Sequence, residues 1–316
     1  MKRLLVALCF AAASAHGQDF PNKPVRFITG AAAGSSGDIL ARALGDRVSA
    51  TWKQPVIIEN KPGAGGLISG QALLASPPDG HTVFIAAGSY VTITPATTAV
   101  MPYDVDKDFT ALAFIAEIPL VIAARAGTPY KTLPELIAYA KANPGKVNYA
   151  ANTPGTFPNL ATEYFSEKAG IKMTFVPYKG TAAALQDILG ERLDVAVEGV
   201  GPYAAAIKAG QLIPLAVTSE RRDPTLPSVP AVAEIVPGYS AVGFYVALAH
   251  ARTPEPMAAK LSADIRAALA QPAIVKRYAD LGMYVKPMTR EEVTAFIQKE
   301  REIWAGVVKR TGVRPQ

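Results

Sequence analysis

The sequence predicts an α/β protein made of two similar lobes, each a mostly parallel sheet flanked by helices. A short apolar strand, a loop of small residues and a helix start follow one another three times in the first half of the chain. The same order recurs three times in the second half, and strands that alternate with helices at this spacing are typical of parallel sheets. Two apolar runs, 111–124 and 242–249, are placed to pass between the lobes.

Composition favours a globular protein with ample material for a core. Half of the 316 residues are apolar and 18% are charged, and the length suits one large domain or two of ordinary size. The formal charge is +6, and the charged side chains are dispersed. Nucleic-acid binding needs a clustered basic patch, so we expect no nucleic-acid partner, and the basic balance weakly favours an anionic ligand.

The N-terminus has the pattern of a secretory signal peptide. A basic start is followed by about ten apolar residues, too few to span a bilayer, and cleavage fits after Ala15 or Gly17, so residues 1–17 are assigned to the signal. Cys9, the one cysteine, lies inside it, and Leu8 before it argues against a lipid anchor. We therefore expect a soluble, exported mature chain without disulfides or thiol chemistry.

The first repeat unit is a strand over 25–29, a glycine-rich loop and a helix from about residue 36. First-turn N–H groups lack partners and the helix dipole is positive there, so bare amides at such a turn attract anions. The alternative is that the glycines serve turn geometry alone. Candidate ligand contacts in this loop are Ala33, Gly34, Ser35 and Ser36, and Ser35, Ser36 or Asp38 is expected to cap the helix.

Two further units complete the first half. A strand over 55–59 leads into a glycine loop and a helix over 67–75, and a strand over 82–87 ends at Gly88. Ligands of open parallel sheets bind at the carboxyl ends of the strands, which adds Gly65, Ser89 and Tyr90 to the candidates. Residues 95–110 are expected to be loop, and 111–124 to form two strands, the second crossing between lobes.

The second half repeats the pattern. A capping box, Thr132 with Glu135, opens a helix to Ala142. Strands are expected over 147–151, 174–177 and 195–198, each followed by a small-residue loop and a helix. The loop candidates are Asn152, Thr153, Thr156, Phe157, Tyr178, Lys179, Thr181 and Glu198. For the hydroxyls the alternative is a cap or turn bond, for Lys179 a solvated position, and for the aromatic rings core or interlobe packing.

The C-terminal part is expected to return to the first lobe. After a strand over 215–218 and a mostly irregular segment over 224–237, the run 242–249 would cross back. Helical segments follow over 255–281, interrupted at Pro272, and over 290–310, where Thr289 and Glu292 form a second capping box. Lobe 1 would comprise 19–120 and 243–316 and lobe 2 would comprise 121–242, closing on a ligand like a hinged clamp.

Enzyme signatures are missing from the sequence pattern. Gly34-Ser35-Ser36-Gly37 is followed by Asp38, so it fails as a nucleophile elbow, and Gly63-Ala64-Gly65-Gly66 is neither a dinucleotide fingerprint nor a P-loop. No spacing of histidines and carboxylates suggests a metal. We therefore predict binding without catalysis, no cofactor and no metal.

Two stretches are the most distinctive, Glu59–Gly66 and Val176–Gly180. Further stretches that support them are Pro21–Arg26, Asp38–Arg42, Pro78–Gly80, Pro102–Asp104, Lys107–Phe109, Pro144–Ala150, Leu226–Pro230 and Thr253-Pro254. With these stretches the chain resembles the periplasmic solute receptors of tripartite tricarboxylate transporters, the Bug family, over nearly all of its mature length. The resemblance implies a Venus-flytrap fold of the type II periplasmic binding proteins, and a ligand carboxylate held by amides, hydroxyls and waters of two lobe 1 loops.

The sequence departs from that family at the first loop. The usual Pro-Phe-Pro-Pro-Gly-Gly before the aspartate is replaced by Gly30-Ala31-Ala32-Ala33-Gly34-Ser35, and Phe244 stands where tryptophan is common. The loss of a ring and of proline stiffness predicts a roomier pocket suited to a bulkier or aromatic carboxylate. The alternative is sequence drift with an unchanged ligand.

The predicted function is a monomeric periplasmic receptor that carries a small carboxylate to membrane permease subunits. The resemblance implies a di- or tricarboxylate, an acidic amino acid or an aromatic acid. The second hypothesis is an exported hydrolase that uses the same cleft, and it requires His81 or His250 to face the loops. A sensor that docks a membrane signalling partner is the third hypothesis.

Overall fold

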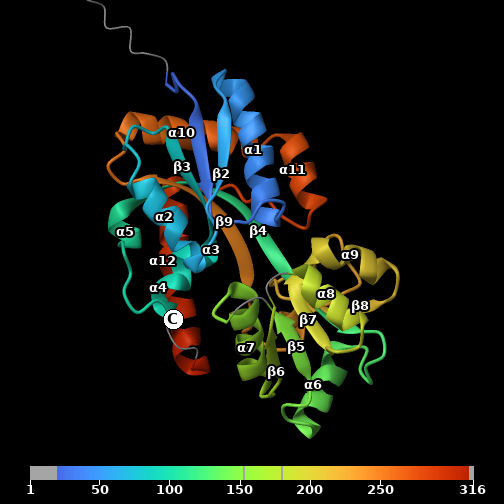
Figure 1. Ribbon diagram of the computed structural model, residues 1–316. Coiled ribbons are helices and arrows are strands. Elements are labelled where there is room, and N and C mark those ends of the chain that lie inside the picture. The colour runs from blue at the N-terminus through green and yellow to red at the C-terminus, as the bar shows by residue number, and fades with distance from the viewer. Residues whose placement is uncertain (1–19, 152–153, 179–180, 313–316) are drawn as a thin grey trace, which may run out of the picture.

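Nine strands of the described residues form one connected set in the order β2-β1-β3-β9-β4-β7-β5-β6, with β8 also paired to β4. The computed structural model describes residues 20–151, 154–178 and 181–312, so the predicted signal peptide lies outside the described residues. Figure 1 shows two groups of strands and helices, one above the other, joined by β4 and β9. The predicted two-lobed α/β architecture is thus confirmed.

Lobe 1 is built on three parallel strands at one end of this order. β1 pairs with β2 on one side and with β3 on the other. Helices cover this sheet on both faces (Figure 1). Its elements are β1 (Val25–Thr29), α1 (Ser36–Trp52), β2 (Val56–Asn60), η1 (Ala64–Gly66), α2 (Leu67–Leu74), β3 (Thr82–Ala87), α3 (Gly88–Thr92), α4 (Thr94–Thr97), α5 (Val105–Asp108), α10 (Glu255–Leu269) and α11 (Pro272–Ala279).

Lobe 2 repeats the arrangement with β5 between β6 and β7, all parallel. The capping box of Thr132 and Glu135 opens its first helix as predicted. The elements of lobe 2 are α6 (Leu133–Ala142), β5 (Asn148–Ala151), α7 (Phe157–Ala169), β6 (Thr174–Pro177), α8 (Thr181–Leu189), β7 (Val195–Gly199), α9 (Val200–Lys208), β8 (Leu212–Val217) and η2 (Val232–Glu234).

Three elements are shared by the lobes: β4 (Phe109–Arg125), β9 (Val242–His250) and α12 (Arg290–Thr311). β4 pairs antiparallel with β9 up to Pro119, and from Leu120 onward with β7 and β8. Helix α12 buries Val293 and Ile297 beside β9, and Trp304 in the core of lobe 2. The lobe limits at 120/121 and 242/243 stay a prediction.

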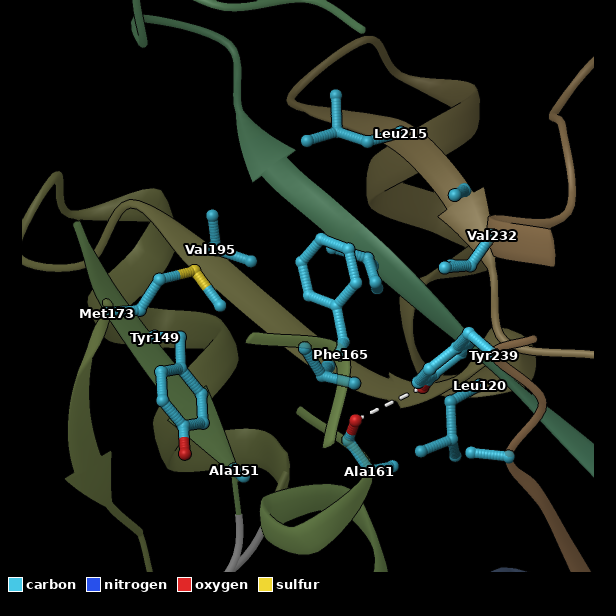
Figure 2. Packing of buried hydrophobic residues seen from close by; sticks show 14 of the residues in the cluster. Leu120, Tyr149, Ala151, Ala161, Phe165, Met173, Val195, Leu215, Val232 and Tyr239 are labelled. Carbon is cyan, nitrogen blue, oxygen red and sulfur yellow. Dashed lines mark hydrogen bonds between the residues drawn. The ribbon is translucent and has the colours of Figure 1, made fainter. Parts of the chain in front are cut away.

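Each lobe has its own apolar core. In lobe 1, α1 and α10 pack on β1 and β3 around Phe27 and Val83. Figure 2 shows the lobe 2 core, where Phe165 lies among Val195, Leu215 and Tyr239. The Tyr239 hydroxyl donates to the carbonyl oxygen of Ala161 at 3.1 Å. The elements packed on these two cores position the loops between the lobes.

Two local predictions were wrong. Residues 109–125 form one strand rather than two, because the strand exchanges partners without a break where the Leu120 N–H donates to Thr218 Oγ1 at 3.0 Å. Residues 95–110, expected to be loop, contain the short helices α4 and α5. The Asp104 side chain caps α5 by accepting from the N–H groups of Asp106 and Lys107, a local signal that the sequence did carry.

Candidate functional site

A cavity of about 260 Å³ lies between the lobes. Its walls come from the first turns of α1 and α3, the loop into α7, the junction of β7 and α9, the crossing strands β4 and β9, the segment after α11, and α12. The lining residues are Ser36, Ala87, Gly88, Ser89, Tyr90, Thr92, Ile118, Leu120, Thr156, Phe157, Pro158, Glu198, Gly199, Pro202, Val242, Gly243, Phe244, Tyr245, Leu281, Met283 and Trp304.

The lobe 1 wall is rich in hydroxyl groups. It presents Ser36 from α1, Ser89 and Tyr90 from α3, and Tyr245 from β9. Burial raises the pKa of Tyr90 and of Tyr245, and for Tyr245 the nearby Tyr90 and Glu198 raise it further. Both phenols therefore keep their protons at neutral pH and can donate hydrogen bonds into the cavity.

Glycines let these aromatic rings lie against the loops. A Cβ on Gly66, whose φ is +89°, would stand 2.2 Å from Cγ of Tyr90, and one on Gly30 would stand 2.6 Å from the same ring. A Cβ on Gly37 would stand 2.5 Å from the Tyr245 hydroxyl oxygen. The glycines of the loops thus make room for the two tyrosines that line the cavity, and the Tyr245 hydroxyl lies at the first turn of α1.

Asp38 holds the first loop in place. Its carboxylate accepts from the Gly34 N–H at 2.9 Å, from Arg42 Nε at 3.0 Å and from Asn60 Nδ2 at 2.8 Å. Burial opposes ionisation of this carboxyl, but the hydrogen bonds from Arg42, Gly34 and Asn60 bring its pKa below the usual value. Asn60 also donates to the carbonyl oxygen of Ala31 at 3.0 Å, which ties the loop to β2.

The lobe 2 wall combines two helix starts with one carboxylate. Thr156 is the N-cap residue of α7 and Gly199 is that of α9. Glu198 accepts at Oε1 from the Gly199 N–H at 2.9 Å and at Oε2 from Thr181 Oγ1 at 3.0 Å. Among the described lining residues, only Glu198 has a carboxyl group, and none is a lysine, arginine or histidine.

Between these polar walls the cavity is apolar. Phe157, Phe244 and Trp304 supply aromatic surface, and Trp304 uses its Nε1–H for a 3.0 Å bond to Glu300. The Phe157 and Trp304 rings meet edge to face with centroids 5.3 Å apart. The remaining apolar wall is formed by Ile118, Leu120, Val242, Leu281 and Met283.

Six of the predicted site residues line the cavity together: Ser36, Ser89, Tyr90, Thr156, Phe157 and Glu198. Six other described candidates do not: Ala33, Gly34, Ser35, Gly65, Tyr178 and Thr181. Asn152, Thr153 and Lys179 lie outside the described residues.

The hydroxyls that point elsewhere have other partners. Ser35 is the N-cap residue of α1, but it makes no side-chain cap bond and donates to the Ala32 carbonyl oxygen at 2.7 Å. The Tyr178 hydroxyl donates to Asp187 at 2.7 Å. Thr181 reaches the cavity only through Glu198. Only the Ser35 bond is the turn bond that was the alternative for a hydroxyl, whereas Tyr178 and Thr181 bond to carboxylate side chains.

Several lining residues were not among the predicted contacts, notably Tyr245, Met283 and Trp304. Tyr245 lies at the start of the predicted return strand, and a residue at a crossing between lobes faces the cleft, so that signal was present. Trp304 comes from the helix predicted over 290–310, and Met283 comes from the segment before that helix. Their approach to the cavity depends on tertiary packing, and no local pattern carries that information.

Neither described histidine lines the cavity. His81 precedes β3 and packs its ring on Phe20, and His250 ends β9 and accepts from the Arg252 N–H at 3.0 Å. The cavity lies at the opposite ends of both strands, beside Ala87 and Val242. The hydrolase hypothesis required one of these histidines to act as a base in the cavity, so it loses its support. The described residues contain no cluster suited to a metal ion.

Comparison with known sequences decides the family. The model of the tripartite tricarboxylate transporter family receptor, TctC, matches residues 40–313. The chain belongs to this receptor family. The receptor is 30% identical to Bordetella pertussis BugT over 98% of its own length and 96% of that protein. The predicted membership of the Bug and TctC group is therefore confirmed, and the family is one of solute receptors.

Solved structures agree. The receptor is similar to Rpa4515 of R. palustris, solved with adipate, at a TM-score of 0.86 and 28% identity, covering 94% of this chain and 100% of that one. It is also similar to MatC of Rhodopseudomonas palustris, solved with bound malate, at a TM-score of 0.80 and 29% identity, covering 92% and 100%. This likeness confirms the two-lobed type II fold. In the described part of the receptor, no helix combines the length and apolarity needed to cross a membrane.

Proposed function

We propose that this receptor binds a small carboxylate in the cavity between its lobes. The observation that carries the proposal is the convergence of lobe 1 hydroxyl groups and of helix starts from both lobes on one cavity. Helix first turns offer unpartnered N–H groups and a positive dipole end, and hydroxyls supply further donors without a formal charge. Such a wall can stabilise a bound carboxylate through charge-assisted hydrogen bonds, without an ion pair to lysine or arginine.

The relatives support the ligand class. Rpa4515 was solved with adipate and MatC with malate, and both share the fold along nearly their whole length with this chain. We infer that the anchoring end of the cavity is the lobe 1 wall around Ser36 and Tyr245. The lobe 2 wall would complete the enclosure when the lobes close over the ligand.

We further propose export and a transport role. Residues 1–17 have the pattern of a signal peptide, the family is one of transporter receptors, and the similar BugD is a periplasmic binding protein. The receptor would act as a monomer that passes its ligand to membrane permease subunits. Uptake of a labelled ligand by cells should then require both this chain and the permease. Uptake that is unaffected by deletion of the chain contradicts this role.

Thermal unfolding against a panel of acids tests the binding function. Malate, adipate, citrate, glutamate and benzoate are each added in increasing amounts to the purified protein, with neutral dimethyl adipate as the control. A ligand at about 100 times its Kd adds about 2.7 kcal/mol to the free energy of unfolding. We expect at least one acid to raise the midpoint and the diester to leave it unchanged. No rise with any acid, or an equal rise with the diester, refutes carboxylate binding.

A further inference from the structure

The Phe157 ring lines the cavity and is held in place from two sides. Phe157 begins α7, and its side chain is half-buried. On one side the ring meets the Trp304 ring edge to face, with centroids 5.3 Å apart. On the other side it covers Gly243 of β9, where a Cβ would stand 3.2 Å from the ring. Two fixed neighbours thus hold the ring ready to contact a ligand in one orientation.

The anchoring hydroxyl of Tyr245 lies further along the same strand. Gly243 and Tyr245 are two residues apart on β9, so they point to the same face of that strand, and both line the cavity. Their backbones are about 7 Å apart along the strand. The Tyr245 hydroxyl lies at the first turn of α1, because a Cβ on Gly37 would stand 2.5 Å from it. A carboxylate held there would point the body of its ligand toward Phe157.

The side chains packed with the Phe157 ring offer a ligand body apolar contacts. Phe157 packs against the apolar cluster that contains Leu120 and Trp304, and all three line the cavity. The Trp304 Nε1–H already donates to Glu300 at 3.0 Å. A polar ligand atom placed beside these side chains would lose its bonds to water without gaining a partner from them. An apolar ring gains ring-to-ring contact there and loses less conformational freedom than a flexible chain.

We propose that Phe157 makes the receptor selective for carboxylates whose body is an apolar ring that packs on the Phe157 side chain. This inference rests on the proposed function, because it assumes that the cavity binds a carboxylate at all. It concerns the ligand body and is independent of the number of carboxyl groups. Rpa4515 and MatC were solved with the open-chain acids adipate and malate, so this receptor would differ from both in the body that it prefers.

Isothermal titration with three matched monoacids tests the proposal. Tetrahydropyran-4-carboxylate has the shape of cyclohexanecarboxylate with one ring CH₂ replaced by oxygen, and heptanoate has the same number of carbons in an open chain. We expect cyclohexanecarboxylate to bind at least fivefold more tightly than the ether and at least threefold more tightly than heptanoate. Phe157→Ala should reduce both ratios to less than twofold. Tyr164→Ala removes another α7 ring beside Trp304 that does not line the cavity, and it should leave both ratios unchanged.

The outcomes distinguish the inference from the function. Equal binding of the three acids by the wild-type protein overturns the inference and leaves carboxylate binding intact. Ratios that persist in Phe157→Ala, or that fall equally in Tyr164→Ala, overturn the role of Phe157. Absence of binding by every acid removes the proposed function and the inference with it. If Phe157→Ala fails to fold, Phe157→Leu replaces it: the preference over heptanoate should fall below twofold and the preference over the ether should persist, and an unchanged preference over heptanoate overturns the role of the ring.

Discussion

At the scale of single residues, Ser35 and Ser36 show how one position along a helix start separates a structural hydroxyl from a ligand contact. Ser35 donates back to the Ala32 carbonyl oxygen, whereas Ser36 lines the cavity. Both residues are small and polar, and both follow the same glycine loop. The difference arises from the direction in which α1 begins, which Asp38 fixes through its bond from the Gly34 N–H.

Replacing each serine by alanine measures that difference. Ser36→Ala removes a hydroxyl that we assign to the ligand carboxylate, and a hydrogen bond to a charged group is worth about 1.5–3 kcal/mol, or roughly 10- to 100-fold in Kd. Ser35→Ala should leave the Kd of the best acid unchanged. Titration calorimetry of both variants checks this. An equal loss of affinity in the two variants, or a loss only in Ser35→Ala, would contradict the assignment of this contact to Ser36.

Gly37 and Gly306, both within helices, allow a second comparison of a site residue with a control. A Cβ on Gly37 would stand 2.5 Å from the Tyr245 hydroxyl and 2.9 Å from the Ala31 Cβ, so Gly37→Ala must displace the tyrosine and weaken acid binding about tenfold or more. A Cβ on Gly306 would meet only the mobile end of Arg310, at 3.1 Å. Gly306→Ala should therefore stabilise α12 by up to about 1 kcal/mol and leave the Kd unchanged. Unimpaired binding by Gly37→Ala would contradict the placement of Tyr245.

At the scale of elements, α12 carries a partly buried acid, Glu300, whose effect on stability depends on pH. Burial raises the pKa of Glu300, and Glu117 raises it further, although the bond from Trp304 and the charges of Lys299 and Lys286 oppose the rise. The folded state then keeps a proton that the unfolded state loses above about pH 4.5. The free energy of unfolding falls as pH rises from there to the folded pKa.

Glu300→Gln should remove this loss while its amide oxygen still accepts from Trp304. We expect the variant to gain stability over the wild-type protein as pH rises from 4 to 7, and to show no gain at pH 4. Urea unfolding at several pH values measures it. Glu302→Gln on the exposed face of α12 changes the charge equally and should show no such trend. A stability difference that is constant with pH would rule out the buried proton.

The elements also show what local sequence carries. Both capping boxes, Thr132 with Glu135 and Thr289 with Glu292, were predictable because each contact spans three residues. The prediction of two strands over 111–124 was wrong because the continuity of β4 depends on Thr218, which is distant in sequence. In the site, hydroxyls that directly follow strands were predictable, whereas Trp304 comes to the cavity only through the tertiary docking of α12.

At the scale of the whole molecule, the lobes are coupled by elements that belong to both. Strand β4 is buried along nearly its full length and changes partners between Pro119 and Leu120. Behind the crossing strands, Tyr284 pairs with Glu117 through backbone bonds and donates its hydroxyl to the buried Asp223 of lobe 2 at 2.6 Å. Neither lobe can unfold without exposing part of these shared elements.

We therefore expect the two lobes to unfold in a single cooperative transition. The sequence holds two tryptophans, Trp52 in the lobe 1 core and Trp304 in the lobe 2 core, so Trp52→Phe and Trp304→Phe each leave one reporter for the other lobe. Within each variant, the midpoint by fluorescence should coincide with that by far-ultraviolet circular dichroism, because unfolding either lobe disrupts β4 and α12. A saturating acid should raise both midpoints of Trp52→Phe together. If fluorescence changes before circular dichroism in either variant, the lobe that holds the remaining tryptophan unfolds alone. The shared elements would then be hinges that do not couple the stabilities of the two lobes.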